Sequence, residues 1–354
     1  MLKVISQVFI LVMGLGVLSS ADAAALFGPE PLPVLELTLK APWSQIAGDK
    51  SEKPVDVPAQ LVLADGKTRE IKVRPRGKSR RDKLVCRFPP LWLDLPKKKM
   101  GETVFDGQNK LKLVTHCASK GDIRTRLVDQ LWSEYLLYRV LNLLTHASFR
   151  VQPAQVTYED TRRGSTITRP AFLIEHKDQV VARLQDQQMS WQELEIKQVG
   201  VGSLDHQFSA LVGLFQYFAG NTDFSFVRGP VGENCCHNGV PVGANNITKV
   251  LAYDFDSTGF VDPSYSEPLP KLKISKLTQR LYRGFCLHND ALPVAIQTFI
   301  DNESAIVQMI EQTPELSRKR AAKLKRFTGE FFKTLKSEKL LQRRIYKKCR
   351  KLAQ

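Results

Sequence analysis

The stretch DIRTRLVDQLWSEYLLYRVLNLL, residues 122–144, marks the point where the character of the chain changes. Leucines and a tryptophan recur in it at helical spacing, which predicts one long and mostly apolar helix. Residues 34–115, which precede it, favour β-structure, and most segments after residue 178 favour helix. This order predicts an α+β fold, with a β-rich N-terminal lobe followed by a mainly helical C-terminal lobe.

Shorter patterns on both sides of this helix predict the remaining elements. Apolar and polar residues alternate from Val34 to Lys40, as in a half-buried strand. Two apolar runs flank Asp65-Gly66, a dipeptide that predicts a β-hairpin turn. A second apolar helix is predicted from His206 to Ala219, where Gly220-Asn221 is a stop signal. Further strands are predicted at residues 83–88, 110–114, 152–158, 171–174 and 249–253.

The first residues have the pattern of a secretory signal peptide. Lys3 precedes an apolar run, and Ala21-Asp22-Ala23 is a cleavage site of the A-x-A type. A membrane anchor is the less favoured alternative, because the apolar run is shorter than the about 20 residues that spanning requires. We therefore predict an exported protein, periplasmic or extracellular, with a signal peptide at 1–23. The predicted lobes are 24–178 and 179–312, followed by a tail at 313–354.

Basic residues concentrate in the tail. The chain has 354 residues and a net charge of +16, of which residues 318–351 contribute +13. Its 43% of apolar and 25% of charged residues exclude a disordered or collagen-like protein. Apolar side chains of the tail recur on one broad helical face, which predicts a docked amphipathic helix. Its basic side can contact an anionic polymer or membrane, and no specific nucleic acid partner is predicted.

An even number of cysteines in an exported chain favours disulfides. The chain has six, and we predict that Cys86 pairs with Cys117. One of Cys235 and Cys236 is expected to pair with Cys286, and the other with Cys349. A zinc site is the alternative, but no C-x-x-C pair is present to support it. Its ligands would come from Cys235, Cys236, His237, Cys286 and His288.

Glu134 is an acidic residue on an apolar helix face, since it lies seven residues from both Leu127 and Leu141. A carboxylate in such a place needs a cation or a hydrogen-bond donor. Lys110 and Lys112, on the preceding strand, are the candidate partners. The alternative is that Glu134 lies at the edge of the face and reaches water.

Acidic and amide side chains follow the second apolar helix and the strand at 249–253. Such positions on a rigid scaffold often hold catalytic groups. Carboxylates and amides also suit Mg²⁺ that is bound together with phosphate oxygens. The alternative is ordinary turn chemistry, because loops use the same residues. The segments are Asn221-Thr-Asp223, His237-Asn238 and Asp254-Phe-Asp256.

Several motifs follow one another in a recognisable order over about residues 34–265. They are Arg76-Gly-Lys-Ser79, the helix from Ile123, Phe172-Leu-Ile-Glu-His-Lys177, Asn221-Thr-Asp223 and Asp254-Phe-Asp256. This order resembles the spore-coat protein H (CotH) kinase-like family. The resemblance implies a two-lobed protein-kinase-like fold that binds ATP with Mg²⁺.

The resemblance also implies a role for each site residue. Asp223 would be the catalytic aspartate that orients the acceptor hydroxyl. Asp254 would bind the metal, helped by Asn238 or Asp256. The nucleotide would be bound by the hinge at Glu175, by Lys112 (or, less favoured, Lys110) and by Glu134 as the partner of that lysine.

Two functions follow as hypotheses. The first is an exported enzyme that transfers a phosphoryl or nucleotidyl group from ATP to an unknown acceptor, largely by positioning and charge neutralisation. The second is a non-catalytic pseudokinase or binding protein of the envelope, which uses its basic tail. Arg228 favours the second hypothesis, because it stands where ordinary kinases have a metal-binding asparagine.

Overall fold

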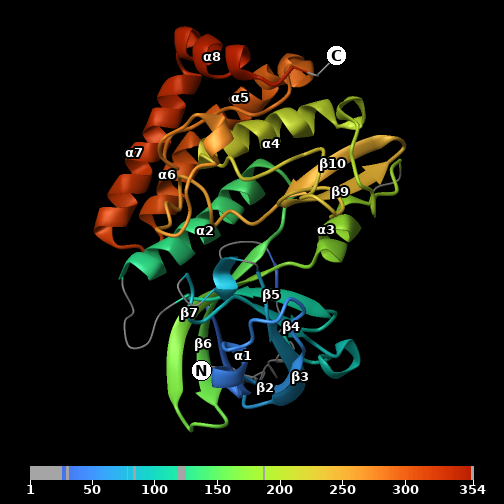
Figure 1. The fold of residues 1–354 in the computed structure, drawn as a ribbon, viewed down its shortest axis with the longest axis vertical. Coiled ribbons are helices and arrows are strands. Elements are labelled where there is room, and N and C mark those ends of the chain that lie inside the picture. The colour runs from blue at the N-terminus through green and yellow to red at the C-terminus, as the bar shows by residue number, and fades with distance from the viewer. Residues whose placement is uncertain are drawn as a thin grey trace, which may run out of the picture.

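The computed structural model describes residues 26–28, 32–77, 79–82, 85–117, 125–185 and 188–351. It has a β-barrel at one end and a helical body at the other (Figure 1). The predicted signal peptide at 1–23 lies outside the described residues. None of the described helices is both long enough and apolar enough to cross a membrane.

The barrel consists of seven strands that close in the order β1-β2-β3-β4-β5-β7-β6. Neighbouring strands are antiparallel except for β1 and β6, which pair in parallel and close the barrel. A four-residue helix, α1 (Trp43–Ile46), follows the first strand. The strands are β1 (Leu35–Ala41), β2 (Val57–Leu63), β3 (Thr68–Pro75), β4 (Leu91–Asp94), β5 (Lys110–Val114), β6 (Val151–Asp160) and β7 (Thr166–Ile174).

Alternation along the strands explains the interior of the barrel, since every second side chain points inward. Leu37 and Leu39 of β1 are buried, and so is Leu61 of β2, which pairs with Leu39. The turn between β2 and β3 contains Gly66 at φ +81°, a conformation that glycine adopts without strain. The predicted hairpin around Asp65-Gly66 is therefore confirmed.

The predicted two-lobed protein-kinase-like fold is wrong. The N-terminal strands form a closed seven-stranded mixed barrel, and the helices lie mostly C-terminal to it. Closure depends on the pairing of Leu35–Ala41 with Ala154–Asp160, two segments far apart in the chain. Alternation within one strand predicts a half-buried surface, but it does not distinguish an open sheet from a closed barrel.

The helical body is built around α4, which spans the predicted residues His206–Ala219. The side chain of Asp205 caps its first turn, and Gly220 ends it in the left-handed conformation at φ +63°. A three-stranded sheet packs beside it in the order β10-β9-β8. The elements are α2 (Thr125–Leu144), α3 (Lys177–Leu184), β8 (Gln192–Glu193), β9 (Gly239–Ala244), β10 (Ile247–Ala252), α5 (Leu292–Asp301), α6 (Glu303–Glu311), α7 (Arg318–Leu335) and α8 (Glu338–Arg344).

Two hydrophobic cores meet at the ends of the barrel strands. One core fills the barrel, and the other fills the helical body. Val114, Phe172 and Ile174, at the ends of β5 and β7, belong to the helical core together with most of α2. Side chains that follow these strand ends therefore lie where the barrel meets the helical body.

Two local predictions differ from the structure. The tail is not one helix but two, α7 and α8, and both bury apolar side chains such as Leu324 and Leu341 against the body. Of the strand predicted at 83–88, the described residues 85–88 form a turn, and the next strand begins at Leu91. Pro89 and Pro90 separate this turn from β4, which is consistent with the poor fit of proline within strands.

Candidate functional site

The site is a cleft of about 630 Å³ between the barrel and the helical body, named here the central cleft. Its barrel wall is cationic, and its body wall carries carboxylates, an imidazole and an amide. The cationic side chains are Lys53, Arg74, Arg76, Arg80 and Arg81, and the body wall includes Asp223, His237, Asn238, Asp254 and Asp256.

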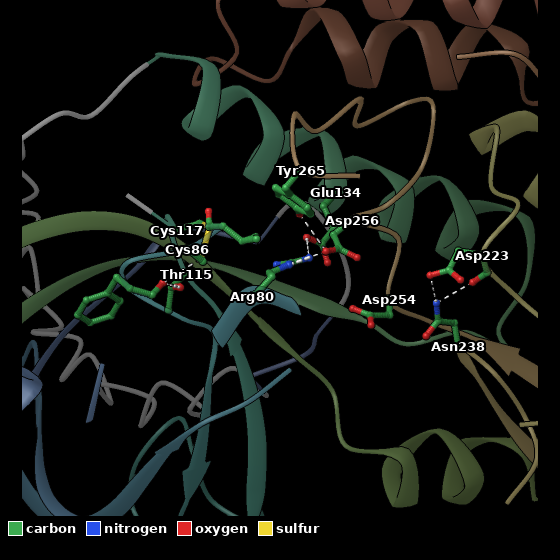
Figure 2. Close-up of polar contacts among 12 residues, drawn as sticks. Arg80, Cys86, Thr115, Cys117, Glu134, Asp223, Asn238, Asp254, Asp256 and Tyr265 are labelled. Atoms are coloured by element: carbon green, nitrogen blue, oxygen red, sulfur yellow. Dashed lines mark hydrogen bonds and ion pairs between the residues drawn. A yellow bond between two sulfur atoms is a disulfide. The ribbon is translucent and has the colours of Figure 1, made fainter. Parts of the chain in front are cut away.

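A buried ion network closes one end of the cleft. The Arg80 guanidinium donates from Nη2 to Glu134 Oε2 at 2.9 Å and from Nε to Asp256 Oδ2 at 2.6 Å. The Tyr265 hydroxyl donates to the same Asp256 oxygen at 2.9 Å. Figure 2 shows the two carboxylates converging on the guanidinium. One arginine thus joins a short turn of the barrel to α2 and to the loop after β10.

The two carboxyl groups of this network differ in their pKa values. Burial raises the pKa of Glu134 to about 7, although Arg80 acts against the shift. Burial also acts to raise the pKa of Asp256, but the charge and hydrogen bond of Arg80 outweigh it and keep that pKa below its ordinary value. Asp256 is therefore the firmer anionic partner of Arg80.

A second polar cluster, centred on Asp223, lies on the body wall of the cleft. His237 Nε2 lies 2.7 Å from Asp223 Oδ1, and Asn238 Nδ2 donates to the Asp223 backbone carbonyl at 2.7 Å and to Oδ2 at 3.2 Å. The bond to Asp223 raises the pKa of His237 despite its partial burial. Asn221 Oδ1 accepts a hydrogen bond from the Asp223 backbone N–H, which shapes the loop after α4.

Asp254 lies between these two groups (Figure 2). Its backbone is left-handed at φ +62°, and its N–H donates to the Tyr138 hydroxyl at 2.9 Å. Burial and the neighbouring charge of Asp256 raise the pKa of the Asp254 carboxyl. Its side chain makes no hydrogen bond or ion pair within the described residues. This carboxylate is thus held in the cleft wall without a cationic partner in contact.

Lys112 approaches the cleft from β5 through an aromatic cage. Its Nζ lies 4.0 Å from the Tyr253 ring centroid, 5.6 Å from that of Trp92 and 5.9 Å from that of Phe149. Burial, followed by the charge of Arg76, lowers the pKa of Lys112 to about 7. The described residues offer it no ion pair. Tyr253 and Trp92 also line the cleft, so the ammonium lies just behind its wall.

Some predicted site residues have other partners than expected. Glu134 is bound by Arg80 and not by Lys112 or Lys110. Asp256 is engaged by Arg80 and Tyr265, which leaves it poorly suited to help Asp254 bind a metal. Asp223, Asn238 and Asp254 line one cleft. Their predicted roles in catalysis and metal binding stay predictions.

Glu175 is a structural anchor. Its buried carboxylate pairs with the Arg183 guanidinium, and Oε2 also accepts the backbone N–H of Arg150 at 2.9 Å. The backbone N–H of Glu175 donates to the Arg150 carbonyl at 3.0 Å. These bonds tie the end of β7 to the start of β6, and Glu175 does not line the cleft. Its predicted role at a nucleotide hinge stays a prediction.

The donor set of the cleft fits only one kind of metal binding. The described residues contain no group of three His, Cys, Asp or Glu side chains that could hold a metal. Mg²⁺, however, is commonly held by one or two carboxylates together with phosphates and water. The unpartnered carboxylate of Asp254 fits that arrangement, with Asp223 and Asn238 on the same wall.

Sequence reasoning missed the cationic wall. Arg76 and Lys78-Ser79 were recognised as a motif, but Arg80, the next residue, was not assigned a role. His237 is a candidate zinc ligand in the sequence and belongs to the segment His237-Asn238, but the sequence assigns it no partner. Its position beside Asn238 was the available signal, but a contact with Asp223 cannot be derived from a separation of 14 residues.

Three pairs of cysteines lie within disulfide-bonding distance. Cys86–Cys117 confirms the prediction. The other two predicted pairs are wrong, because the neighbours Cys235 and Cys236 pair with each other and Cys286 pairs with Cys349. No free cysteine remains among the described residues, so nothing supports a zinc site. Paired cysteines favour an oxidising, non-cytoplasmic compartment.

No family model matches this chain, and a search of curated proteins found no match either. The resemblance to the CotH family therefore stays a prediction.

Proposed function

We propose that the protein acts outside the cytoplasm as an ATP- and Mg²⁺-dependent transferase, which moves a phosphoryl or nucleotidyl group to an acceptor hydroxyl. The observation that carries this proposal is the central cleft, in which a cationic wall faces the unpartnered carboxylate of Asp254. The negative charges of a polyphosphate chain are complementary to the cationic wall, and its bound divalent cation is complementary to the Asp254 carboxylate. Phosphoryl transfer needs mainly such positioning and neutralisation of charge.

The cationic wall would bind the phosphates. Arg76 has no ion-pair partner within the described residues, so its guanidinium is available to a phosphate oxygen. Arg80 is already occupied by two carboxylates and would act by holding the wall in place. A phosphate near Lys112 would favour its charged form and so add a cation when the ligand binds.

The body wall would hold the cation and the acceptor. Mg²⁺, when bound, would neutralise phosphate charge next to Asp254 and Asn238. Asp223 is the group that would orient the acceptor hydroxyl and receive its proton at Oδ2, because Oδ1 is held by His237. The raised pKa of His237 extends the pH range over which its imidazolium can pair with Asp223 Oδ1 and fix the orientation of that carboxylate.

Thermal unfolding with ATP, Mg²⁺ or both tests this proposal. We expect a shift only with both, since a ligand at 100 times its dissociation constant stabilises a protein by about 2.7 kcal/mol. Asp254→Asn should remove the shift, whereas Asp223→Asn should keep it and abolish transfer to an acceptor. Asp94→Asn, which alters a barrel carboxylate outside the cleft, is the matched control. No shift for the wild-type protein at saturating ATP and Mg²⁺ would refute the proposal.

A second candidate is the non-catalytic binding of anionic polymers or membranes through the tail. It is favoured by a separate cavity of about 1030 Å³ whose lining includes seven Lys or Arg side chains and one Glu. The basic residues are Lys273, Arg280, Lys323, Arg326, Arg343, Arg344 and Lys348. Sedimentation with phosphatidylglycerol vesicles tests it. Binding that survives the combined change Arg326→Gln, Arg343→Gln and Lys348→Gln would contradict it.

A further inference from the structure

A second cavity opens on the other side of Asp223 and His237. It has a volume of about 650 Å³, and these two residues line both it and the central cleft. Among the described residues that line it, Asp223 is the only acidic one, against five cationic side chains. We name this cavity the anion pocket, after Arg228, Lys271, Arg283, Arg350 and Lys351.

The cations of the anion pocket are not neutralised by the protein. None of the five forms an ion pair within the described residues. Arg350 lies over the Phe285 ring at 4.9 Å and makes no side-chain hydrogen bond there, and Arg228 donates only to the neutral Gln198 at 3.2 Å. Unpaired positive charge gathered around one concave surface favours an anionic ligand.

Arg283 connects this pocket to Asp223. Its Nη1 donates to the backbone carbonyls of Thr222 and Phe224, the residues on either side of Asp223. Its Nε and Nη2 make no hydrogen bond within the described residues and remain free for a ligand. The guanidinium also lies 5.0 Å from the Phe224 ring centroid, which fixes its orientation. A ligand held by Arg283 would therefore lie next to the segment that positions Asp223.

The C-terminal end of the chain completes the pocket. Cys286 and Cys349 form a disulfide with their Cα atoms 4.9 Å apart. The Cys286 N–H donates to the Arg350 carbonyl at 3.0 Å, and the Arg350 N–H donates to the Gly284 carbonyl at 2.8 Å. This bridge holds Arg350 beside Phe285 at the pocket wall. The cation is thus built into the site and does not belong to a mobile chain end.

We propose that the anion pocket binds the acceptor of the transfer reaction, and that the acceptor is a small hydroxyl compound carrying a phosphate. The proposal rests on the function proposed above. The phosphate would be bound by Arg283 and Arg350, and the hydroxyl would point to Asp223. Its oxygen would form a bond with the γ-phosphorus of ATP while the bond to the β,γ-bridging oxygen breaks. The hydroxyl proton passes to Asp223, and ADP leaves.

Isothermal titration of the full-length protein with glycerol 3-phosphate, a hydroxyl compound carrying one phosphate, tests the pocket directly. We expect saturable binding, and no binding of uncharged glycerol. The double variant Arg350→Gln/Lys351→Gln should raise the dissociation constant at least about tenfold, as expected for the loss of a charge-assisted hydrogen bond. These side chains are exposed and make no side-chain hydrogen bond within the described residues, so folding should be preserved.

The matched control is Lys97→Gln/Lys98→Gln, which removes the same charge from exposed barrel positions and should leave the affinity unchanged. If wild type and the Arg350→Gln/Lys351→Gln variant bind glycerol 3-phosphate with equal affinity, the proposal that this pocket binds the phosphate is wrong. Asp254→Asn separates the two proposals, because it should abolish ATP binding and leave glycerol 3-phosphate binding intact. If the wild-type protein does not bind ATP but still binds glycerol 3-phosphate in a way that depends on Arg350, the transferase proposal is wrong. The proposal that the anion pocket binds a phosphate compound is then still supported.

Discussion

Two pairs of carboxylates lie where the helical body meets the barrel, and their surroundings differ. Asp223, Asp254 and Asp256 line the central cleft, and Glu134 lies behind it, bound to the same Arg80 as Asp256. Glu134 and Asp256 are sealed by the Arg80 guanidinium, with side-chain exposures of 4% and 11%. Asp223 and Asp254 line the central cleft, where Asp223 is held by His237 and Asn238, and where Asp254 has no side-chain partner among the described residues.

Glu134 and Asp256 thus form a pair whose charge the protein itself compensates, whereas the described residues supply no cation to Asp254. A buried carboxylate whose cation is already in place has no remaining capacity for a ligand, and it contributes to stability only while that cation is present. A carboxylate without a cation destabilises the fold until a ligand supplies one. The first pair should therefore matter most for stability, and the second for binding.

The largest effect is expected from Arg80→Met. It leaves two buried carboxylates without a cation, which should lower the free energy of unfolding by about 3–5 kcal/mol. Urea unfolding at pH 7 measures this. Lys325→Met, which breaks the exposed pair with Glu311, should cost less than about 1 kcal/mol. A loss below about 1 kcal/mol for Arg80→Met would mean that the network is not the structural seal inferred here.

Asp254→Asn should have the opposite effect on stability. The pKa of Asp254 is raised on folding, so the ionised group destabilises the protein at neutral pH and the penalty disappears as the pH falls through the folded pKa. The variant should unfold at higher urea concentration at pH 7 than wild type and bind ATP with Mg²⁺ at least about tenfold more weakly. If Asp254→Asn is less stable than wild type at pH 7, the Asp254 carboxylate stabilises the fold, as Glu134 and Asp256 do, and this prediction is wrong.

Lys112→Met tests the cage behind the cleft. The pKa of Lys112 falls on folding from 10.5 to about 7, so wild-type stability should rise with pH between about 7 and 10.5, where the unfolded lysine holds a proton that the folded one has lost. The variant should lose that rise, whereas Lys97→Met, an exposed change, should retain it. Free energies of unfolding measured across this pH range test the prediction. Identical pH profiles for wild type and Lys112→Met would show that the pKa of Lys112 is not lowered on folding.

The smallest effect is expected at His237. Its pKa is raised mainly by the bond to Asp223, so it stabilises the fold below pH 6.5 and loses that contribution as the pH rises through the folded pKa. Asp223→Asn should lower the pKa of His237, because burial is then opposed only by the smaller contributions of Asp254 and Glu233. Titration of the imidazole by NMR measures the change. An unchanged midpoint would show that the Asp223 contact does not control the histidine.

Local patterns predicted much of the secondary structure because they depend on neighbours in the chain. The helix His206–Ala219 was predicted to the residue, since its apolar periodicity and the Gly220 stop lie within one segment. The cleft residues Asp223 and Asp254 could be singled out from the sequence because each follows the end of a buried element, α4 or β10, whereas Asn238 precedes β9.

Other features depended on contacts between distant segments. The partner of Glu134 is Arg80, 54 residues earlier, and the sequence offers many basic residues between which periodicity cannot choose. The same holds for the cysteines, since pairing depends on which segments meet, and only Cys86–Cys117 was identified correctly.

The sequence by itself thus determined the division into a β-rich and a helical part and the types of side chain available to the site. Only the tertiary structure decided that the strands close into a barrel through β1 and β6, that Arg80 binds both Glu134 and Asp256, and that no described residue supplies a cation to Asp254. The physical reason is that periodicity and turn chemistry act over a few residues. Barrel closure and the neutralisation of buried charge instead depend on groups brought together from distant parts of the chain.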